Sequence, residues 1–294
     1  MEIGSYSISE PIPQLNKPHL ISVLYPWIDA GSSATLALSR IRSRFASKHF
    51  AELKNPSHFF DMTRYRPNTE QKGKERKVVL PNTKFWYGKL EGQPDMLFCE
   101  LLEPHAMSED YAKSFIEMLK FFDVKRHIRI GSMLDTVPHT RPLRLTGNVE
   151  LEYSALFENI LSPRRSVYEG PTSITMALLT EEQKKLGIET NSFMLHLPQY
   201  LDLEKDYSGA AKLIEALSVL YGMPIECPET SRGRRQYEQI TKQLSLEANT
   251  DLRKIILKLE EMFDKNQKIV SESEQASPLS PEIEQFIKDL ETHT

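Results

Sequence analysis

The sequence contains little cysteine. Its 294 residues include 2 cysteines, Cys99 and Cys227, which lie far apart and do not have the spacing of a zinc-binding motif. We therefore expect each cysteine to pack as a small hydrophobic residue and not to form a disulfide. This composition fits a protein of a reducing compartment.

Long apolar runs are also missing. No stretch reaches the roughly 18 apolar residues that a membrane-spanning helix needs, and residues 1–18 do not combine a basic region with an apolar stretch, as a secretion signal would. The chain is 39% hydrophobic and 27% charged, as in ordinary globular proteins. We expect a cytoplasmic protein without a membrane partner.

The charge is balanced, with a net value of -4 at pH 7. A slightly acidic chain has no general electrostatic attraction to phosphate backbones, and the sequence shows no local basic patch that would suggest one. Nucleic acid is therefore not an expected partner.

Four apolar runs resemble buried strands, and helical stretches follow three of them directly. The strands are expected at residues 19–25, 95–104, 127–134 and 192–198, and the helices at 34–45, from about Ser108 onward, and at 208–222. Strands that alternate with helices predict an α/β fold, in which helices cover both faces of a mainly parallel sheet.

Other segments define the expected domain organisation. Residues 76–81 and 84–93 look like two short strands of a hairpin, and residues 70–75 look like a polar turn before them. We expect an N-terminal extension (1–18), an α/β core domain (19–228), a helical appendage (229–270) and a Ser/Glu/Pro-rich linker (271–280). Residues 281–294 are expected to dock as a short helix through an apolar stripe of Ile283, Phe286, Ile287 and Leu290.

Ligands of such folds bind at the carboxyl ends of the parallel strands, so candidate site residues follow the strands. Asp29 follows the first strand, although capping of the next helix is the commoner role for Asp at such a place. Gly31 and Ser32 could hold an anion at a helix N-terminus, but they do not form a known phosphate-binding motif.

Two histidines and an arginine also follow strands. His105 and His139 could pair as metal ligands or acid–base groups, but Gln199 stands where a third histidine would be needed, so we expect no metal and no cofactor. Arg141 could clamp a carboxylate or phosphate, although an internal salt bridge, for example to Glu169, is the favoured interpretation. No nucleophile motif is present, and we assign no catalytic residue.

Several motifs, taken in order, resemble the proteasome assembly chaperone 2 family, especially its bacterial and archaeal members. They are PWIDAGSSATLAL, FFDMTRYRP, EPH, DTVPHTRPLRLTG and YEGPTSITMALL, and the likeness extends from about Leu20 to Gly222 and into the helical region beyond. The resemblance implies a three-layer α/β domain of the phosphorylase/hydrolase-like type and a homo-oligomer, for which we favour a trimer. It marks a strand-end crevice with no established reaction, formed by Asp29, Gly31, His105, His139, Thr140, Arg141, Glu169, Gly170 and Thr172.

Two functions remain open. We favour a non-catalytic protein-binding or assembly-chaperone-like role, in which the chain binds itself and possibly another protein complex. The alternative is a protein or enzyme that binds a small ligand, an anion or a nucleotide, in the crevice. Some members of the family dock on proteasome rings through a C-terminal hydrophobic–tyrosine–any-residue motif. This sequence ends in Thr292-His293-Thr294, so we do not expect docking by that route.

Overall fold

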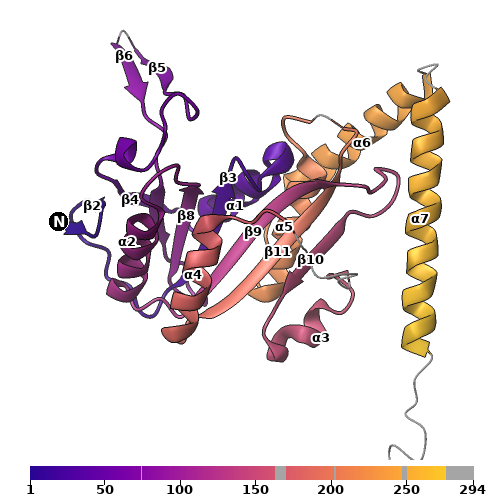
Figure 1. The fold of residues 1–294 in the computed structure, drawn as a ribbon. Helices are drawn as coiled ribbons and strands as arrows, with labels where there is room; N and C mark the ends of the chain where they lie inside the picture. Colours follow the sequence, from indigo (N-terminus) through magenta and orange to yellow (C-terminus); the bar gives the residue numbers. More distant parts are fainter. Residues whose placement is uncertain (74, 163–169, 202, 247–249, 276–294) are drawn as a thin grey trace, which may run out of the picture.

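The computed structural model describes residues 1–73, 75–162, 170–201, 203–246 and 250–275, and its centre is a nine-stranded mixed sheet (Figure 1). The strand order is β1-β2-β4-β7-β8-β3-β9-β11-β10. The strands are β1 (Glu2–Ile3), β2 (Tyr6–Ile8), β3 (His19–Tyr25), β4 (Lys48–Leu53), β7 (Lys84–Gly88), β8 (Met96–Leu102), β9 (Arg126–Asp135), β10 (Arg144–Asn148) and β11 (Glu189–Pro198).

The four central strands are parallel and correspond to the four apolar runs of the sequence. β8, β3, β9 and β11 pair in parallel, and antiparallel strands flank them on both sides. Strands covered on both faces need apolar side chains at nearly every position, which explains the continuous runs. The prediction of these four strands is confirmed.

Helices cover both faces of the sheet, so the predicted three-layer α/β fold is also confirmed. One core cluster lies between the sheet and α2 and α4, and a second lies between the sheet and α1 and α5. The bounds are α1 (Ser33–Arg44), α2 (Ser108–Phe121), α4 (Ile174–Lys185) and α5 (Tyr207–Leu220), with short turns η1 (Ala30–Ser32), η2 (Pro56–His58), η3 (Leu151–Tyr153) and α3 (Ser154–Phe157).

The sequence analysis did not predict α4, because its inward face is not uniformly apolar. Its buried residues are Thr175, Leu179 and Gln183. A mixed polar and apolar inner face gives a weak helical periodicity, so pattern analysis misses the helix.

The N-terminal segment is not an extension outside the core. β1 and β2 pair with each other, and β2 pairs with β4, which places residues 2–8 in the main sheet. The Tyr6 side chain is fully buried in the first core cluster. Strands of two and three residues are too short for an alternating pattern to reveal them.

The predicted hairpin of residues 76–81 with 84–93 is wrong. Residues 84–88 form β7 of the main sheet, whereas β6 (Glu75–Val79) pairs with β5 (Asn68–Lys72) in a separate two-stranded sheet. Residues 70–75, which were expected to form a polar turn, therefore supply most of β5 and the turn between β5 and β6. Polar residues can form this strand because it lies on the surface, where no core selects an apolar pattern.

The appendage is helical, as predicted, and consists of α6 (Pro228–Leu246) and α7 (Thr250–Gln275). α6 packs on α5, whereas α7 stands beside the domain (Figure 1). Because α7 continues to Gln275, the linker does not begin at residue 271. Ser, Glu and Gln all tolerate a helix, and the first proline comes at Pro278. The rest of the predicted linker and the docking helix lie outside the described residues.

Disulfides and membrane-spanning helices can be examined in the described part of the chain. Neither Cys99, which is buried, nor Cys227 forms a disulfide. None of the helices in the described ranges combines the length and the apolar character that crossing a membrane requires.

Candidate functional site

Asp29 caps a helix, which is the alternative that the sequence favoured. Its Oδ1 accepts hydrogen bonds from the backbone amides of Ala34 (2.8 Å) and Thr35 (3.1 Å), and its Oδ2 accepts one from the Thr35 hydroxyl. These donors belong to the first turn of α1. The oxygens of Asp29 are therefore occupied by its own helix, a contact worth about 1 kcal/mol.

Gly31 and Ser32 contact the loop that precedes α5. Gly31 has φ of 57°, and its carbonyl accepts a hydrogen bond from the amide of Asp206 at 2.7 Å. The Ser32 hydroxyl donates to the carbonyl of Glu204 at 2.9 Å. Asp206 in turn caps α5 by accepting from the amide of Gly209. These residues join two strand-end loops and do not form an open anion cradle.

The two histidines of the candidate site have separate environments. His105 packs against Tyr65 and accepts a hydrogen bond from the amide of Asp61 at 3.2 Å. His139 packs against Tyr200 and Tyr237. No group of three His, Cys, Asp or Glu side chains within the described ranges could hold a metal ion.

His139 is buried and bonded on one side of its ring. The Tyr200 hydroxyl accepts from the His139 backbone amide (2.8 Å) and lies 2.7 Å from Nδ1, so it can donate to that nitrogen. Nε2 is buried without a hydrogen-bond partner among the residues described. Burial lowers the pKa of His139, although Glu260 opposes this effect. The neutral ring therefore packs between Tyr200, which follows β11, and Tyr237 of α6.

Thr140 and Arg141 connect this loop to α7. The Thr140 hydroxyl donates to Glu260, and the Arg141 guanidinium binds Asp264 through two hydrogen bonds of 2.8 and 2.7 Å. Arg141 also lies 3.4 Å from Glu260. The expected ion pair of Arg141 therefore exists, but its observed partners are on α7, and Glu169 lies outside the described residues.

Gly170 and Thr172 lie just before α4, and both are exposed. The adjoining Ser173 donates to the carboxylate of Glu103 at 2.7 Å, and Glu103 also accepts from the amide of Ile174. This contact fixes the start of α4 at the end of β8. The side chains that anchor this segment are thus different from those that anchor the Thr140–Arg141 loop.

The sequence analysis missed a series of three hydrogen-bonded side chains, of which His196 and Thr146 are buried and Asp135 is partly exposed. His196 lies 2.7 Å from Asp135 through Nδ1 and 2.8 Å from the Thr146 hydroxyl through Nε2. The order of hydroxyl, imidazole and carboxylate resembles a hydrolase relay. However, Thr146 lies within β10, is 9% exposed and also faces the carbonyl of Met194. The arrangement can tie β10 to β11 and β9, but it gives a substrate little access.

The hydrogen bond between His196 and Asp135 should make the stability of the fold sensitive to acid. The hydrogen bond from His196 holds the pKa of Asp135 at about 2, below its ordinary value of 3.8. The unfolded state therefore binds a proton first, and the stability that this carboxylate contributes above about pH 4 is lost as the pH falls towards 2, by up to about 2 kcal/mol. Urea unfolding at several acidic pH values should show this loss, and Asp135→Asn should flatten it. An Asp123→Asn control should keep the wild-type profile; an equal profile for Asp135→Asn would contradict the assignment.

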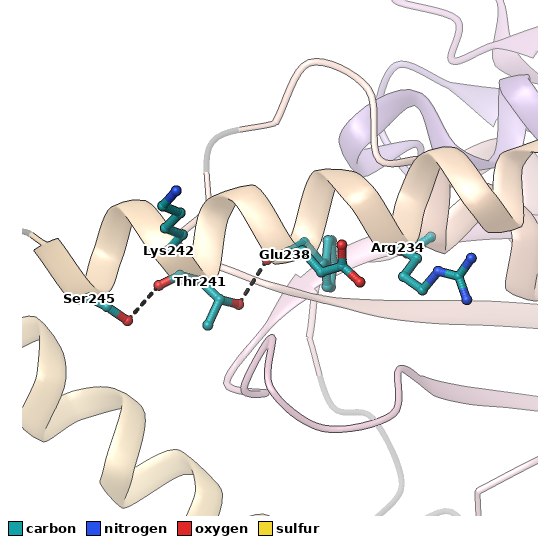
Figure 2. A pocket seen from close by; sticks show the side chains of 7 residues that line it. Arg234, Glu238, Thr241, Lys242 and Ser245 are labelled. Atoms are coloured by element: carbon teal, nitrogen blue, oxygen red, sulfur yellow. Dashed lines mark hydrogen bonds between the residues drawn. The ribbon is translucent and has the colours of Figure 1, made fainter.

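A shallow groove lies along α6 (Figure 2). It encloses about 520 Å³ and is lined by Ser208, Arg234, Tyr237, Glu238, Thr241, Lys242 and Ser245. The hydroxyls of Thr241 and Ser245 donate to carbonyls of their own helix, at 2.8 and 2.7 Å. No residue of the predicted crevice lines this groove. The groove therefore does not support the prediction that the crevice binds a small ligand.

Comparison with known proteins places this geometry in a family. The model of the PAC2 family matches residues 23–245, which include β8, β9, β11, the last three residues of β3 and the candidate loops. The chain belongs to the PAC2 family. A search of curated proteins finds no match.

Solved structures of PAC2 type and others share the fold. A Mycobacterium tuberculosis protein of unknown function has a TM-score of 0.78 and 20% identity, with 93% of each chain covered. A PAC2 family protein from Streptomyces avermitilis has a TM-score of 0.69 and 22% identity, covering 81% of this chain and 99% of its own. A proteasome-assembly chaperone homologue from Mycobacterium tuberculosis has a TM-score of 0.68 and 18% identity, with 81% and 99% covered. At these identities the likeness establishes the fold alone.

Proposed function

We propose that this PAC2 family chain is a non-catalytic, homo-oligomeric protein of the cytoplasm that binds and helps to assemble a multisubunit protein complex. The observation that carries the proposal is the engagement of Thr140 and Arg141 with α7. Both residues belong to the VPHTRP run, one of the two most specific pieces of the resemblance, and the Arg141 guanidinium is bound by carboxylates of α7. A trimer is the favoured assembly, and the fold of a proteasome-assembly chaperone homologue supports a protein partner.

α7 offers a surface suited to such binding. Leu259 is buried, whereas Ile255, Leu257 and Met262 are 51%, 59% and 47% exposed. A helix with apolar side chains on more than one side has more apolar surface than its own domain covers. This supports α7 as a protein-binding element.

The proposal is tested by comparing protein capture with small-ligand binding. Tagged full-length protein should retain a stoichiometric complex from its source cells, and Arg141→Glu, which places a third carboxylate beside Glu260 and Asp264, should reduce its recovery about tenfold. Charge reversal at Arg235, exposed on α6, serves as the matched control. Nucleotides and small anions should leave the melting temperature unchanged. A rise in melting temperature with an anion, together with the absence of any retained complex, would favour the small-ligand function instead.

A smaller effect is expected on stability. Arg141→Ala should lower the free energy of unfolding only slightly, because the guanidinium is 31% exposed and Asp264 is 50% exposed, so solvent screens the pair. It should nevertheless expose α7 to proteolysis, since two hydrogen bonds and two ion pairs to that helix disappear. Limited trypsin digestion followed by mass spectrometry measures this change. Lys242→Ala is the control, and unchanged cleavage within α7 in Arg141→Ala would show that the contact does not hold the helix.

A further inference from the structure

The β5–β6 hairpin is an arm that projects from the domain (Figure 1). Its two strands pair only with each other within the described chain, and nearly all of its side chains are exposed. Val78 is 60% exposed, and Leu80 at the base is 44% exposed. An isolated two-stranded hairpin is only marginally stable in water, so an arm of this kind gains stability when it packs on another surface.

The two faces of the arm differ. On one face Glu70 stands opposite Lys77, a favourable cross-strand pair. The other face carries Arg76 and Val78, opposite Gln71 and Thr69. This second face combines Arg76, which forms no ion pair within the described ranges, with the exposed apolar side chain of Val78.

The arm is basic although the whole protein is acidic. Residues 64–77 contain six basic and two acidic residues, a net charge of +4, whereas the chain as a whole carries -4. Arg64 and Arg66 lie exposed at the base of the arm. The arm therefore favours a partner with acidic and apolar side chains together.

The same sequence contains such a partner. Residues 281–294 carry four acidic residues and one lysine, a net charge of -3, together with the stripe of Ile283, Phe286, Ile287 and Leu290. We propose that the C-terminal segment 281–294 of one copy docks on the β5–β6 arm of a second copy. The stripe packs on Val78 and Leu80, and the carboxylates face Arg76 and Lys77.

The contact is made between copies. α7 and the arm lie on opposite sides of the molecule, and the C-terminal end of α7 points away from the arm (Figure 1). The six residue-to-residue steps from Gln275 to residue 281 span at most about 22 Å when fully extended. A contact of one end of a chain with the other end of the next is head-to-tail, and it closes a ring when the rotation between copies allows. This proposal rests on the homo-oligomer of the proposed function, and it assigns the contact of segment 281–294 with the β5–β6 arm as the interface between copies.

Sedimentation velocity of full-length variants tests this interface. The arm variant Arg76→Glu/Lys77→Glu and the tail variant Phe286→Asp/Ile287→Asp should each weaken self-association by about tenfold or more. The matched control is Lys113→Glu/Lys120→Glu, a double charge reversal at exposed positions of α2, which should associate like the wild type. Because both variant sets change surface or terminal residues, circular dichroism should show unchanged folding.

Mixing the arm variant with the tail variant tests the head-to-tail contact most specifically. A head-to-tail contact has two different halves, so an equimolar mixture of the arm and tail variants should form a one-to-one dimer through the single intact pair of halves. Absence of that dimer, or oligomers of wild-type affinity in either variant alone, would overturn the interface while leaving the oligomer itself standing. Weakened self-association in the arm variant alone would likewise overturn the interface, because the arm would then bind a surface of the second copy other than segment 281–294. A wild-type chain that stays monomeric would instead refute the homo-oligomer of the proposed function.

Discussion

Replacing His127 with alanine is expected to lower the free energy of unfolding by about 3–5 kcal/mol. His127 is fully buried on β9, with Nε2 at 2.6 Å from the Ser22 hydroxyl and Nδ1 at 2.8 Å from the amide nitrogen of Gln183 on α4. Alanine would leave two buried polar groups unpaired and open a cavity between the sheet and α4. Chemical denaturation measures the change, and His58→Ala, at an exposed position, should cost little by comparison. A loss for His127→Ala no larger than the control's would show that this network does not support the fold.

The same histidine should make the fold sensitive to mild acid. Burial lowers the pKa of His127 to about 3, whereas the unfolded chain binds the proton near its ordinary value of 6.5. The unfolded state therefore binds more protons between these values, so stability falls as the pH drops from about 6.5 towards 3, by at most about 1.4 kcal/mol per pH unit.

The acid sensitivity is measured by comparing His127→Gln with the wild type. The variant should show a pH slope that is shallower by about one proton in this window. His19, whose pKa burial lowers to about 4, contributes to the remaining slope in both proteins. Parallel profiles of the two proteins would contradict a buried neutral His127.

Replacing Gly31 with alanine is expected to cost about 2–4 kcal/mol. The residue has φ of 57°, and an added Cβ would lie 2.8 Å from Cβ of Asp206, which is itself buried beneath α6. Gly222 is a matched control, because it has φ of 56° and an added Cβ would meet no atom within 4 Å of the described chain. Gly222→Ala should therefore lose only the conformational part, about 1 kcal/mol. If thermal melting showed the same loss of stability for Gly31→Ala and Gly222→Ala, the contact between Gly31 and Asp206 would not be tight.

The parallel centre of the fold could be predicted because burial on both faces forces a continuous apolar run. β3 illustrates this, since five of its seven residues are buried. The same reasoning fails at the sheet edge and on the surface. β10 contains Arg144, whose partner Asp135 ends the preceding strand β9, and Thr146, whose partner His196 lies 50 residues away on β11. β5 consists entirely of polar residues. Neither strand has a local pattern that periodicity can detect.

The site shows the same division between local and distant contacts. The capping role of Asp29 could be predicted because its partners follow within six residues. Arg141 was expected to form an ion pair, but its partner Asp264 lies 123 residues away on a helix whose position no local rule determines. The separation of His105 from His139 likewise depends on the order of the strands beneath them.

The central claim is that this chain acts as a homo-oligomer that binds proteins. It is tested most directly by the mass of the full-length protein in solution, measured by sedimentation equilibrium across a dilution series into the micromolar range. The account predicts a closed assembly, with a trimer favoured, whose mass falls to that of the 33.9 kDa chain only on strong dilution. A mass equal to one chain throughout the series would contradict it.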